Sequence, residues 1–282
     1  MLNGDLLRDA ILSAANNLAH HKKEVDDLNI FPVPDGDTGT NMSMTLANSA
    51  REMEKISGET AGAVAKINAS ALLRGARGNS GVITSLLFRG FSKGIGDGEY
   101  LTAENLAAAL KLGVEAAYKA VMKPTEGTIL TVARIAADTA SAALAEGKDV
   151  IGVLEAAIEG GKKALAETPE LLPVLKKAGV VDAGGQGFIL ILEGMLSVLR
   201  DGKLITAKDA AESETAGEES ASPRNAAGEF ETDITFTYCT EFIVNRAADC
   251  EKQPGELRAY LESIGDCVVV VDDDEIIKVH VH

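Results

Sequence analysis

Two carboxylates one glycine apart stand in the most informative segment of this chain, Asp35-Gly36-Asp37-Thr38-Gly39-Thr40-Asn41. Carboxylates this close in a turn can converge on one Mg²⁺, an ion that takes oxygen ligands and often keeps phosphate oxygens among them. Residues 38–41 then begin an apolar helical pattern, and the unpaired N–H groups at a helix start attract phosphate. An ordinary Asp-Gly turn with a threonine cap is the simpler interpretation, but it uses neither the second aspartate nor the polar residues that follow. The segment therefore predicts a site for magnesium and a phosphate-bearing ligand.

Three further turns share the same design, a start rich in glycine or threonine that opens a helical pattern. They are Arg77-Gly78-Asn79-Ser80-Gly81, Lys123-Pro124-Thr125-Glu126-Gly127-Thr128 and Asp182-Ala183-Gly184-Gly185-Gln186-Gly187. Alternate connections of an up-and-down helical ring fall at the same end, so the four helix starts are expected to surround one cradle for an anion. The chain has no G-x-x-x-x-G-K-[ST] sequence, which excludes a P-loop nucleotide site.

Composition limits the classes of protein and of partner. The chain has 282 residues, of which 46% are hydrophobic, and this length suggests two folding units. A net charge of −16 argues against nucleic acid or an anionic membrane as a partner. No apolar run reaches the roughly 20 residues of a membrane span, and the first residues lack the apolar core of a signal peptide. Three cysteines make no disulfide framework, so we expect a soluble cytoplasmic protein.

The periodicity changes once along the chain. Residues 1–204 predict a mainly α unit, a bundle or closed ring of antiparallel helices, because apolar residues recur three and four apart. The predicted helices span residues 4–24, 39–56, 60–74, 80–93, 102–122, 128–146, 149–167, 171–178 and 185–200. Residues 205–228 are acidic and aperiodic and predict a flexible linker.

The last part of the chain, residues 229–282, predicts a small α+β domain. Its expected strands span 230–238, 241–245, 267–271 and 275–282, and its expected helix spans 255–264. The chain stops on a strand pattern, which suggests that this domain is a fragment of something longer.

The four turns together resemble a known family. Asn29-Ile30-Phe31-Pro32-Val33-Pro34 followed by the aspartate segment, with the other three turns, is similar to the nucleotide-binding L domain of the dihydroxyacetone kinase superfamily. The resemblance is closer to the A subunits of bacterial fatty acid kinases and covers about residues 1–204. Residues from 229 onward resemble the start of the middle domain of those subunits, through Tyr238-Cys239-Thr240-Glu241-Phe242 and Val279-His280-Val281-His282.

The resemblance implies an antiparallel eight-helix barrel that holds ATP or ADP and two Mg²⁺ ions at one end. Asp35 and Asp37 would be the magnesium ligands and the catalytic residues. Asn29 stands where the dihydroxyacetone kinases have a third aspartate, and Thr38 stands where they have a histidine. The implied nucleotide-binding residues are Thr38, Gly39, Thr40, Asn41, Asn79, Ser80, Gly81, Gly127, Thr128, Asp182, Ala183 and Gly184.

The implied reaction is phosphoryl transfer from ATP to the carboxylate of a fatty acid, giving an acyl phosphate for phospholipid synthesis. The acceptor would be held by a separate lipid-binding B subunit, and the middle domain could form a homodimer. Two alternatives stay open: an L subunit that phosphorylates a small polyol such as dihydroxyacetone, and a nucleotide-binding assembly module without turnover. The linker and the α+β region favour the fatty acid version.

A second set of metal-ligating residue types lies near the end of the chain. Strand alternation places His280 and His282 on one face, and Cys239 lies on or beside a neighbouring strand. A thiolate with two imidazoles could bind Zn²⁺. A solvated polar strand face with a structural cysteine explains the same residues equally well.

Overall fold

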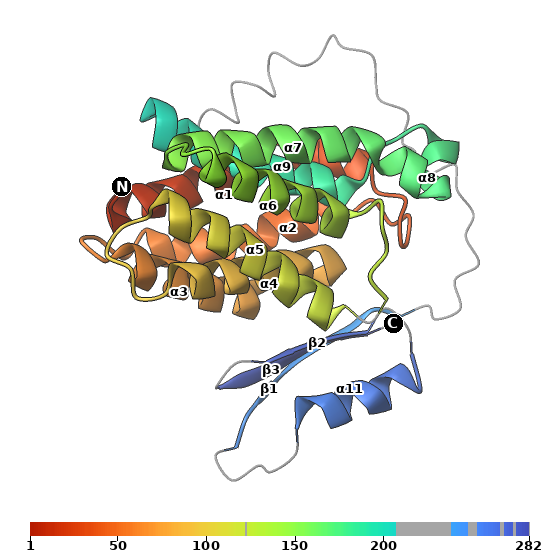
Figure 1. Ribbon diagram of the computed structural model, residues 1–282. Helices are drawn as coiled ribbons and strands as arrows, with labels where there is room; N and C mark the ends of the chain where they lie inside the picture. Colours follow the sequence, from red (N-terminus) through yellow and green to blue (C-terminus); the bar gives the residue numbers. More distant parts are fainter. Residues whose placement is uncertain (122, 207–237, 248–252, 266–267, 273–274, 282) are drawn as a thin grey trace.

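The computed structural model describes residues 1–121, 123–206, 238–247, 253–265, 268–272 and 275–281 (Figure 1). Within these ranges the chain is mainly α, with a small antiparallel sheet near its end, as the sequence predicts. The predicted helices agree with the observed ones to within about one helical turn at each end. Of the predicted strand at 230–238, only Tyr238 is described, and it does not lie in a strand. The predicted linker at 205–228 lies outside the described residues beyond residue 206.

Eight long helices of the described chain close into a ring. They are α1 (Gly4–Asp27), α2 (Thr38–Met53), α3 (Ala61–Gly75), α4 (Gly78–Ile95), α5 (Ala103–Ala120), α6 (Ile129–Ala145), α7 (Val150–Leu171) and α9 (Ala183–Asp201). Each of the first seven packs against the next, and α9 packs against both α7 and α1. The short helix α8 (Pro173–Ala178) lies in the connection between α7 and α9. Because the helices alternate in direction, α2, α4, α6 and α9 all begin at the same end of the ring.

Small residues let the helices approach closely enough to close the ring. The interior is built from Leu, Ile, Val and many Ala side chains, and the described chain contributes few aromatic rings to it. Where α4 meets α5, a Cβ atom added to Gly90 would lie 2.1 Å from the carbonyl oxygen of Leu112. Glycine is therefore required at this crossing, because backbone cannot move aside as a flexible side chain can.

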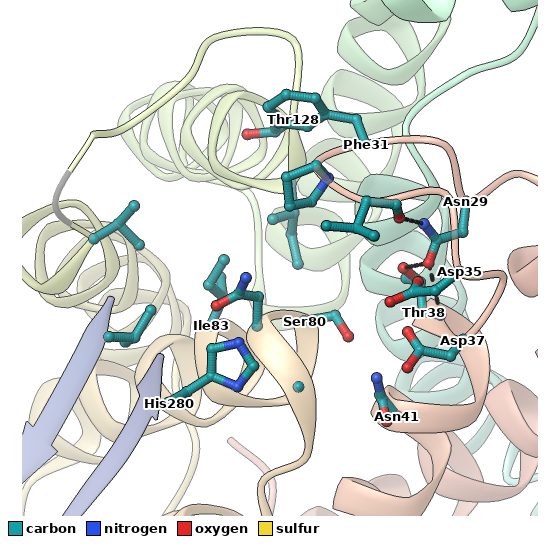
Figure 2. A pocket seen from close by; sticks show the side chains of 18 of the residues that line it. Asn29, Phe31, Asp35, Asp37, Thr38, Asn41, Ser80, Ile83, Thr128 and His280 are labelled. Carbon is teal, nitrogen blue, oxygen red and sulfur yellow. Dashed lines mark hydrogen bonds between the residues drawn. The ribbon is translucent and has the colours of Figure 1, made fainter. Parts of the chain in front are cut away.

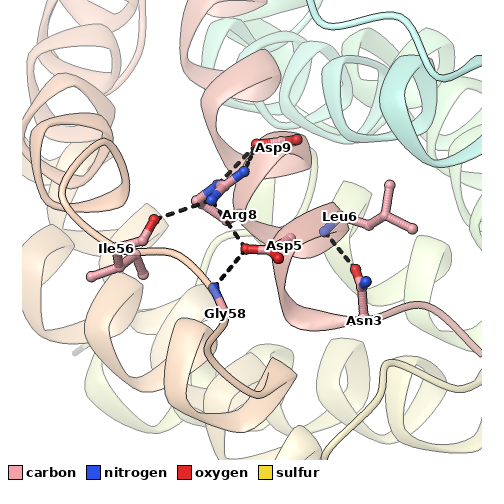
Figure 3. Close-up of polar contacts among 7 residues, drawn as sticks. All are labelled: Asn3, Asp5, Leu6, Arg8, Asp9, Ile56 and Gly58. Carbon is pink, nitrogen blue, oxygen red and sulfur yellow. Dashed lines mark hydrogen bonds and ion pairs between the residues drawn. The ribbon is translucent and has the colours of Figure 1, made fainter.

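A polar clamp lies at the end of the ring where α1 begins (Figure 3). The Arg8 guanidinium donates hydrogen bonds to Asp5 at 3.0 Å, to Asp9 at 2.7 Å and to the carbonyl oxygen of Ile56 at 3.1 Å. The Asp5 carboxylate also accepts from the Gly58 N–H at 3.0 Å. These bonds tie the first turn of α1 to the connection between α2 and α3.

The sheet has the strand order β1-β3-β2, with both pairings antiparallel. Its strands are β1 (Thr240–Asn245), β2 (Val269–Asp272) and β3 (Ile276–Val281), and helix α11 (Pro254–Glu262) precedes β2. In the register, His280 of β3 lies opposite Glu241 on one side and Val269 on the other. The predicted strands at 241–245, 267–271 and 275–282, and the predicted helix at 255–264, are confirmed where the residues are described.

The two faces of the sheet pack against different helices (Figure 1). Val269, Val271 and Ile276 join the apolar core of the helical ring, next to α4 and α5. The alternate residues Val268, Val270, Val279 and Val281 pack with Leu261 of α11 on the other face. The sheet is thus held between the ring and α11. None of the described helices is both long and apolar enough to cross a membrane.

The close crossing of α4 and α5 gives a direct test of the fold. Replacing Gly90 with Ala should lower the free energy of unfolding by about 2 to 3 kcal/mol, because the added methyl group meets backbone. Gly255→Ala in α11 is the control, since open space surrounds that position and alanine favours a helix. Chemical denaturation measures both variants. Equal stability of Gly90→Ala and the wild-type protein would contradict this packing.

Candidate functional site

A cavity of about 820 Å³ lies at the end of the ring where α2, α4, α6 and α9 begin (Figure 2). All four helix starts contribute to its wall, as the sequence predicts, and the sheet adds a further wall. Its lining residues are Asn29, Phe31, Pro32, Val33, Asp35, Asp37, Thr38, Asn41, Arg77, Gly78, Asn79, Ser80, Ile83, Val121, Lys123, Thr125, Thr128, Ile129, Leu130, Asp182, Gly184, Cys239, Glu241, Val268, Val269 and His280.

The first turn of α2 is capped by residues from outside the aspartate pair. The side-chain oxygen of Asn29 accepts from both the N–H, at 3.0 Å, and the hydroxyl of Thr38. Asp26, at the end of α1, accepts from the N–H of Thr40 at 2.9 Å and from its hydroxyl at 2.7 Å. Both threonine donors are therefore occupied, so the α2 start is less open to phosphate than the sequence predicts.

Because Asn29 and Asp26 cap α2, the Asp37 carboxylate can face the cavity. Asp37 holds the N-cap position of α2 but makes no capping hydrogen bond with its side chain. It lies beside Asp35, and both carboxylates face the cavity next to Asn29 and Asn41 (Figure 2). An N-cap aspartate that does not cap its helix has its oxygens available for another ligand.

The two carboxylates repel each other. Desolvation, then the negative charge of Asp37 and a hydrogen bond with it, raise the pKa of Asp35 to about 6. Asp35 is itself exposed toward the cavity, so water screens part of this repulsion. A divalent cation between the two oxygens would remove the repulsion, because it favours the ionised form of both groups.

The start of α4 leaves two of its first three N–H groups open. Gly78 has φ +56°, a backbone conformation that would be strained with a side chain, and a Cβ there would lie 2.5 Å from the side-chain nitrogen of Asn41. Within the described chain, the N–H groups of Asn79 and Ser80 have no acceptor. The side-chain oxygen of Asn79 is also buried without a hydrogen-bond partner among the described residues. The unpaired N–H groups indicate a place for an anionic ligand, whereas the unpaired Asn79 oxygen needs a hydrogen-bond donor or a cation.

One buried carboxylate serves the starts of both α6 and α9. Asp182 accepts from the Gly185 N–H of α9 at 2.7 Å, and the Ile129 N–H of α6 also favours its ionised form. Asp182 is 5% exposed, and burial raises its pKa to about 7 against the effect of these donors. The sequence predicts Asp182 as a nucleotide contact, whereas the structure also makes it a shared cap.

A hydrogen-bonded cluster fixes the loop that precedes α6. The Glu126 carboxylate accepts from the Tyr118 hydroxyl at 3.0 Å, the Thr131 hydroxyl at 2.8 Å and the Arg134 guanidinium at 2.7 Å. The loop carries the cavity residues Lys123 and Thr125. These hydrogen bonds therefore fix the position of Lys123, the one lysine among the described residues that line the cavity.

The sheet places Cys239, Glu241 and His280 at the cavity. His280 is 1% exposed and its Nδ1 lies 3.0 Å from a Glu241 carboxylate oxygen, while the Cys239 Sγ lies 3.6 Å from the same nitrogen. The Glu241 oxygen also accepts from the Gly78 N–H at 2.7 Å. Glu241 thus connects the sheet to the start of α4.

The zinc prediction for Cys239, His280 and His282 finds no support. His282 lies outside the described residues, and the described residues contain no group of three His, Cys, Asp or Glu placed to hold a metal ion. Burial, then the charges of Glu241, Asp37 and Asp35, raises the pKa of the Cys239 thiol. Instead, Nδ1 of His280 is in contact with the Glu241 carboxylate.

Most of the predicted site residues line this one cavity, but some do not. Those outside the lining are Gly39, Thr40, Gly81, Gly127 and Ala183. Gly39 and Gly81 serve packing, because a Cβ on them would lie 2.1 Å from the Lys22 carbonyl oxygen and 2.3 Å from the Thr45 hydroxyl oxygen. Small size rather than ligand contact explains these two glycines.

Several lining residues were not predicted from the sequence. Three of them, Arg77, Lys123 and Thr125, lie inside the turns that begin the helices. Their position in these turns is a sequence feature from which a place at the cavity could be predicted. The apolar residues Val268 and Val269 carry no such signal, because only the docking of the sheet brings them to the cavity.

Comparison with known proteins places the chain in a family. The DAK2 domain family matches residues 32–197, which is more than half of the chain. This chain belongs to the DAK2 domain family. A second family, the FakA-like middle domain of fatty acid kinases, matches residues 235–282. The resemblance predicted from the sequence is therefore confirmed for both parts of the chain.

Similar whole proteins are longer than this chain. Protein YloV of Bacillus subtilis is 44% identical over 283 residues, and a Staphylococcus haemolyticus protein is 43% identical over 283 residues. Each match covers 100% of this chain and 51% of the relative, so the chain spans about half the length of these relatives. The crystal structure of the dihydroxyacetone kinase from C. freundii in complex with AMP-PNP and Mg²⁺ matches with a TM-score of 0.52 and 18% identity. It covers 68% of this chain and 33% of the kinase, and it supports the DAK2-like fold.

The raised pKa of Asp35 gives the metal-free protein a pH-dependent stability. Its folded-state pKa of about 6 lies above the ordinary value of 3.8, so its stabilising contribution is complete below pH 3.8 and is lost as the pH rises through 6. Asp35→Asn removes this loss and should stabilise the metal-free protein by roughly 1 kcal/mol at pH 8, with almost no gain at pH 4.

Denaturation in the presence of a chelator, from pH 4 to pH 8, measures this effect. Asp97→Asn, an exposed carboxylate change at the opposite end of the ring, is the matched control. A difference between Asp35→Asn and wild type that does not change with pH would rule out the repulsion.

Proposed function

We propose that this chain is the ATP-binding part of a kinase that phosphorylates the carboxylate of a fatty acid. One observation carries the nucleotide-binding part of the proposal: a pair of repelling carboxylates and an open helix start face each other across one cavity. Carboxylates and phosphates attract each other only through a cation, so this combination suits a nucleotide bound with a divalent metal ion.

Asp35 and Asp37 would hold the Mg²⁺ ions. Both are oxygen ligands of the kind that magnesium prefers, and neither is used to cap a helix. Bound Mg²⁺ supplies positive charge that neutralises the phosphate oxygens. Asn29 as a further ligand stays a prediction, since its oxygen already accepts two hydrogen bonds from Thr38.

The start of α4 is the proposed phosphate site. The N–H groups of Asn79 and Ser80 and the positive end of the helix dipole point to one place, and Ser80 lies between the aspartate pair and His280 in Figure 2. Arg77 and Lys123 add positive charge to the same cavity. A helix start can thus bind phosphate in a protein whose net charge is −16.

The apolar part of the cavity suits the rest of the nucleotide. Phe31, Pro32, Val33, Ile129 and Leu130 line it beside Thr128. A cavity of about 820 Å³ with apolar walls and a few polar groups is typical of small-molecule sites. We expect the base and ribose to lie here, with the phosphates directed toward α4.

The proposed reaction transfers the terminal phosphoryl group of ATP. An oxygen of the fatty acid carboxylate forms a new bond to phosphorus as the bond to the ADP oxygen breaks, which yields acyl phosphate and ADP. The carboxylate is already ionised at neutral pH, so it needs no strong general base. The role of the chain is therefore to position the phosphates and to stabilise their charge.

The choice of acceptor rests on the second family match. Residues 235–282 match the FakA-like middle domain of fatty acid kinases, and residues of this region line the nucleotide cavity. We infer that a separate lipid-binding protein, the B subunit of such a kinase, presents the fatty acid at this side of the cavity. A polyol kinase or an assembly module would use the same nucleotide site, so the acceptor must be tested separately.

The aspartate pair provides the test of nucleotide binding. Asp35→Asn and Asp37→Asn should each weaken Mg·ADP binding by about 100-fold, because each removes a charged metal ligand. Isothermal titration calorimetry measures the affinity, and Asp97→Asn should bind as wild type does. Unchanged affinity in both cavity variants would contradict the metal assignment.

Radiolabel transfer tests the acceptor. With [γ-³²P]ATP, label should move to a fatty acid bound to its carrier protein, and each cavity variant should lose this transfer while circular dichroism shows an intact fold. Label on dihydroxyacetone would favour the polyol kinase. Mg·ADP binding without transfer to either acceptor would favour the assembly module.

A further inference from the structure

The Glu241 carboxylate lies at the junction between the sheet and the start of α4. One of its oxygens accepts from the Gly78 N–H at 2.7 Å and lies 3.0 Å from Nδ1 of His280. An ionised carboxylate only accepts hydrogen bonds, so the His280 Nδ1 carries the proton in this contact. Glu241 therefore occupies the first N–H of α4 as a bound anion would.

We propose that Glu241 is an internal anion that holds the start of α4 in the nucleotide-free protein, and that a nucleotide phosphate displaces it. Displacement would loosen strand β1 from the helical ring. The proposal rests on the proposed function, because it takes the start of α4 as the phosphate site.

Glu241 carries a negative charge at this position. Burial alone would raise its pKa, but the hydrogen bond from His280, the charge of Lys278 and the N–H of Gly78 outweigh burial and lower the pKa. The neighbouring strand thus keeps the carboxylate ionised. The other charged groups near the junction are Asp35, Asp37 and Arg77, which line the same cavity.

Two anions cannot share this helix turn without a cost. A phosphate on the N–H groups of Asn79 and Ser80 would lie directly beside a carboxylate on the N–H of Gly78. Like charges repel more strongly in a partly closed cavity than in water. Each anion therefore weakens the binding of the other by the same factor, as linkage requires.

Strand β1 depends on the Glu241 contact more than the rest of the sheet does. It is an edge strand that pairs only with β3 in the described sheet, and Phe242, Ile243 and Val244 are 37%, 45% and 42% exposed. By contrast, Val269 and Val271 of β2 are buried in the core of the ring. Release of Glu241 should therefore affect β1 first.

Glu241→Gln and Glu275→Gln form a matched pair of variants. Each variant removes one negative charge from this part of the chain. Glu275 is the control because it pairs with Arg74 of α3 and does not line the cavity. Glutamine keeps the size and the acceptor oxygen of Glu241 but not its charge. Calorimetry with Mg·ADP should show about tenfold tighter binding by Glu241→Gln, and binding within about twofold of wild type by Glu275→Gln.

Hydrogen exchange followed by mass spectrometry gives an independent measure on the wild-type chain. Mg·ADP should increase amide exchange in residues 240–245, while Glu241→Gln, whose uncharged oxygen accepts more weakly, should already show part of this increase without nucleotide. If Glu241→Gln does not fold, as judged by circular dichroism, the wild-type exchange experiment decides the proposal by itself.

Three results overturn the proposal, and they are distinguishable. If the wild-type protein binds Mg·ADP and Glu241→Gln binds it no more tightly, the carboxylate does not compete with phosphate. Unchanged or slower exchange of β1 on nucleotide binding shows that the sheet does not respond. Absence of Mg·ADP binding in every variant, wild type included, removes the proposed function, and the role of Glu241 falls with it.

Discussion

The closed antiparallel ring imposes one constraint on which the rest of this structure depends: every second helix begins at the same end. Each start leaves backbone N–H groups without helical partners, and four starts bring these groups around one cavity. Such groups must be paired by protein, water or ligand. The way in which each start is capped therefore decides where a ligand can bind.

The four starts are capped unequally. Asn29 and Asp26 occupy the first turn of α2, and the single carboxylate of Asp182 serves both α6 and α9. The start of α4 has a protein partner only at its first N–H in the described structure, where Glu241 binds. In the proposed function, the carboxylates of Asp35 and Asp37 would form a metal side of the cavity, and the start of α4 would form a phosphate side. A cation is then what allows an acidic protein to hold an acidic ligand.

The sequence predicts the ring and the aspartate pair because both depend on patterns of residues that are close together in the chain. Apolar periodicity fixed the helices, and the Asp-Gly-Asp turn with its three companion turns indicated one end of the ring. The caps could not be found in this way. Asp26 lies 14 residues before Thr40, and its carboxylate reaches that threonine only because α1 packs beside α2. Glu241 and Gly78 are likewise far apart in the sequence. Strand alternation places Glu241 opposite His280, but only tertiary packing brings that face to the cavity.

The division of the cavity into a metal side and a phosphate side can be tested by crystallography with Mn²⁺ and ADP, since Mn²⁺ has a strong anomalous signal and takes oxygen ligands as magnesium does. We predict an anomalous peak between the carboxylates of Asp35 and Asp37, with a phosphate on the N–H groups of Asn79 and Ser80. A peak elsewhere, or a phosphate bound at the start of α2 or α9 with the aspartate pair unliganded, would contradict this division.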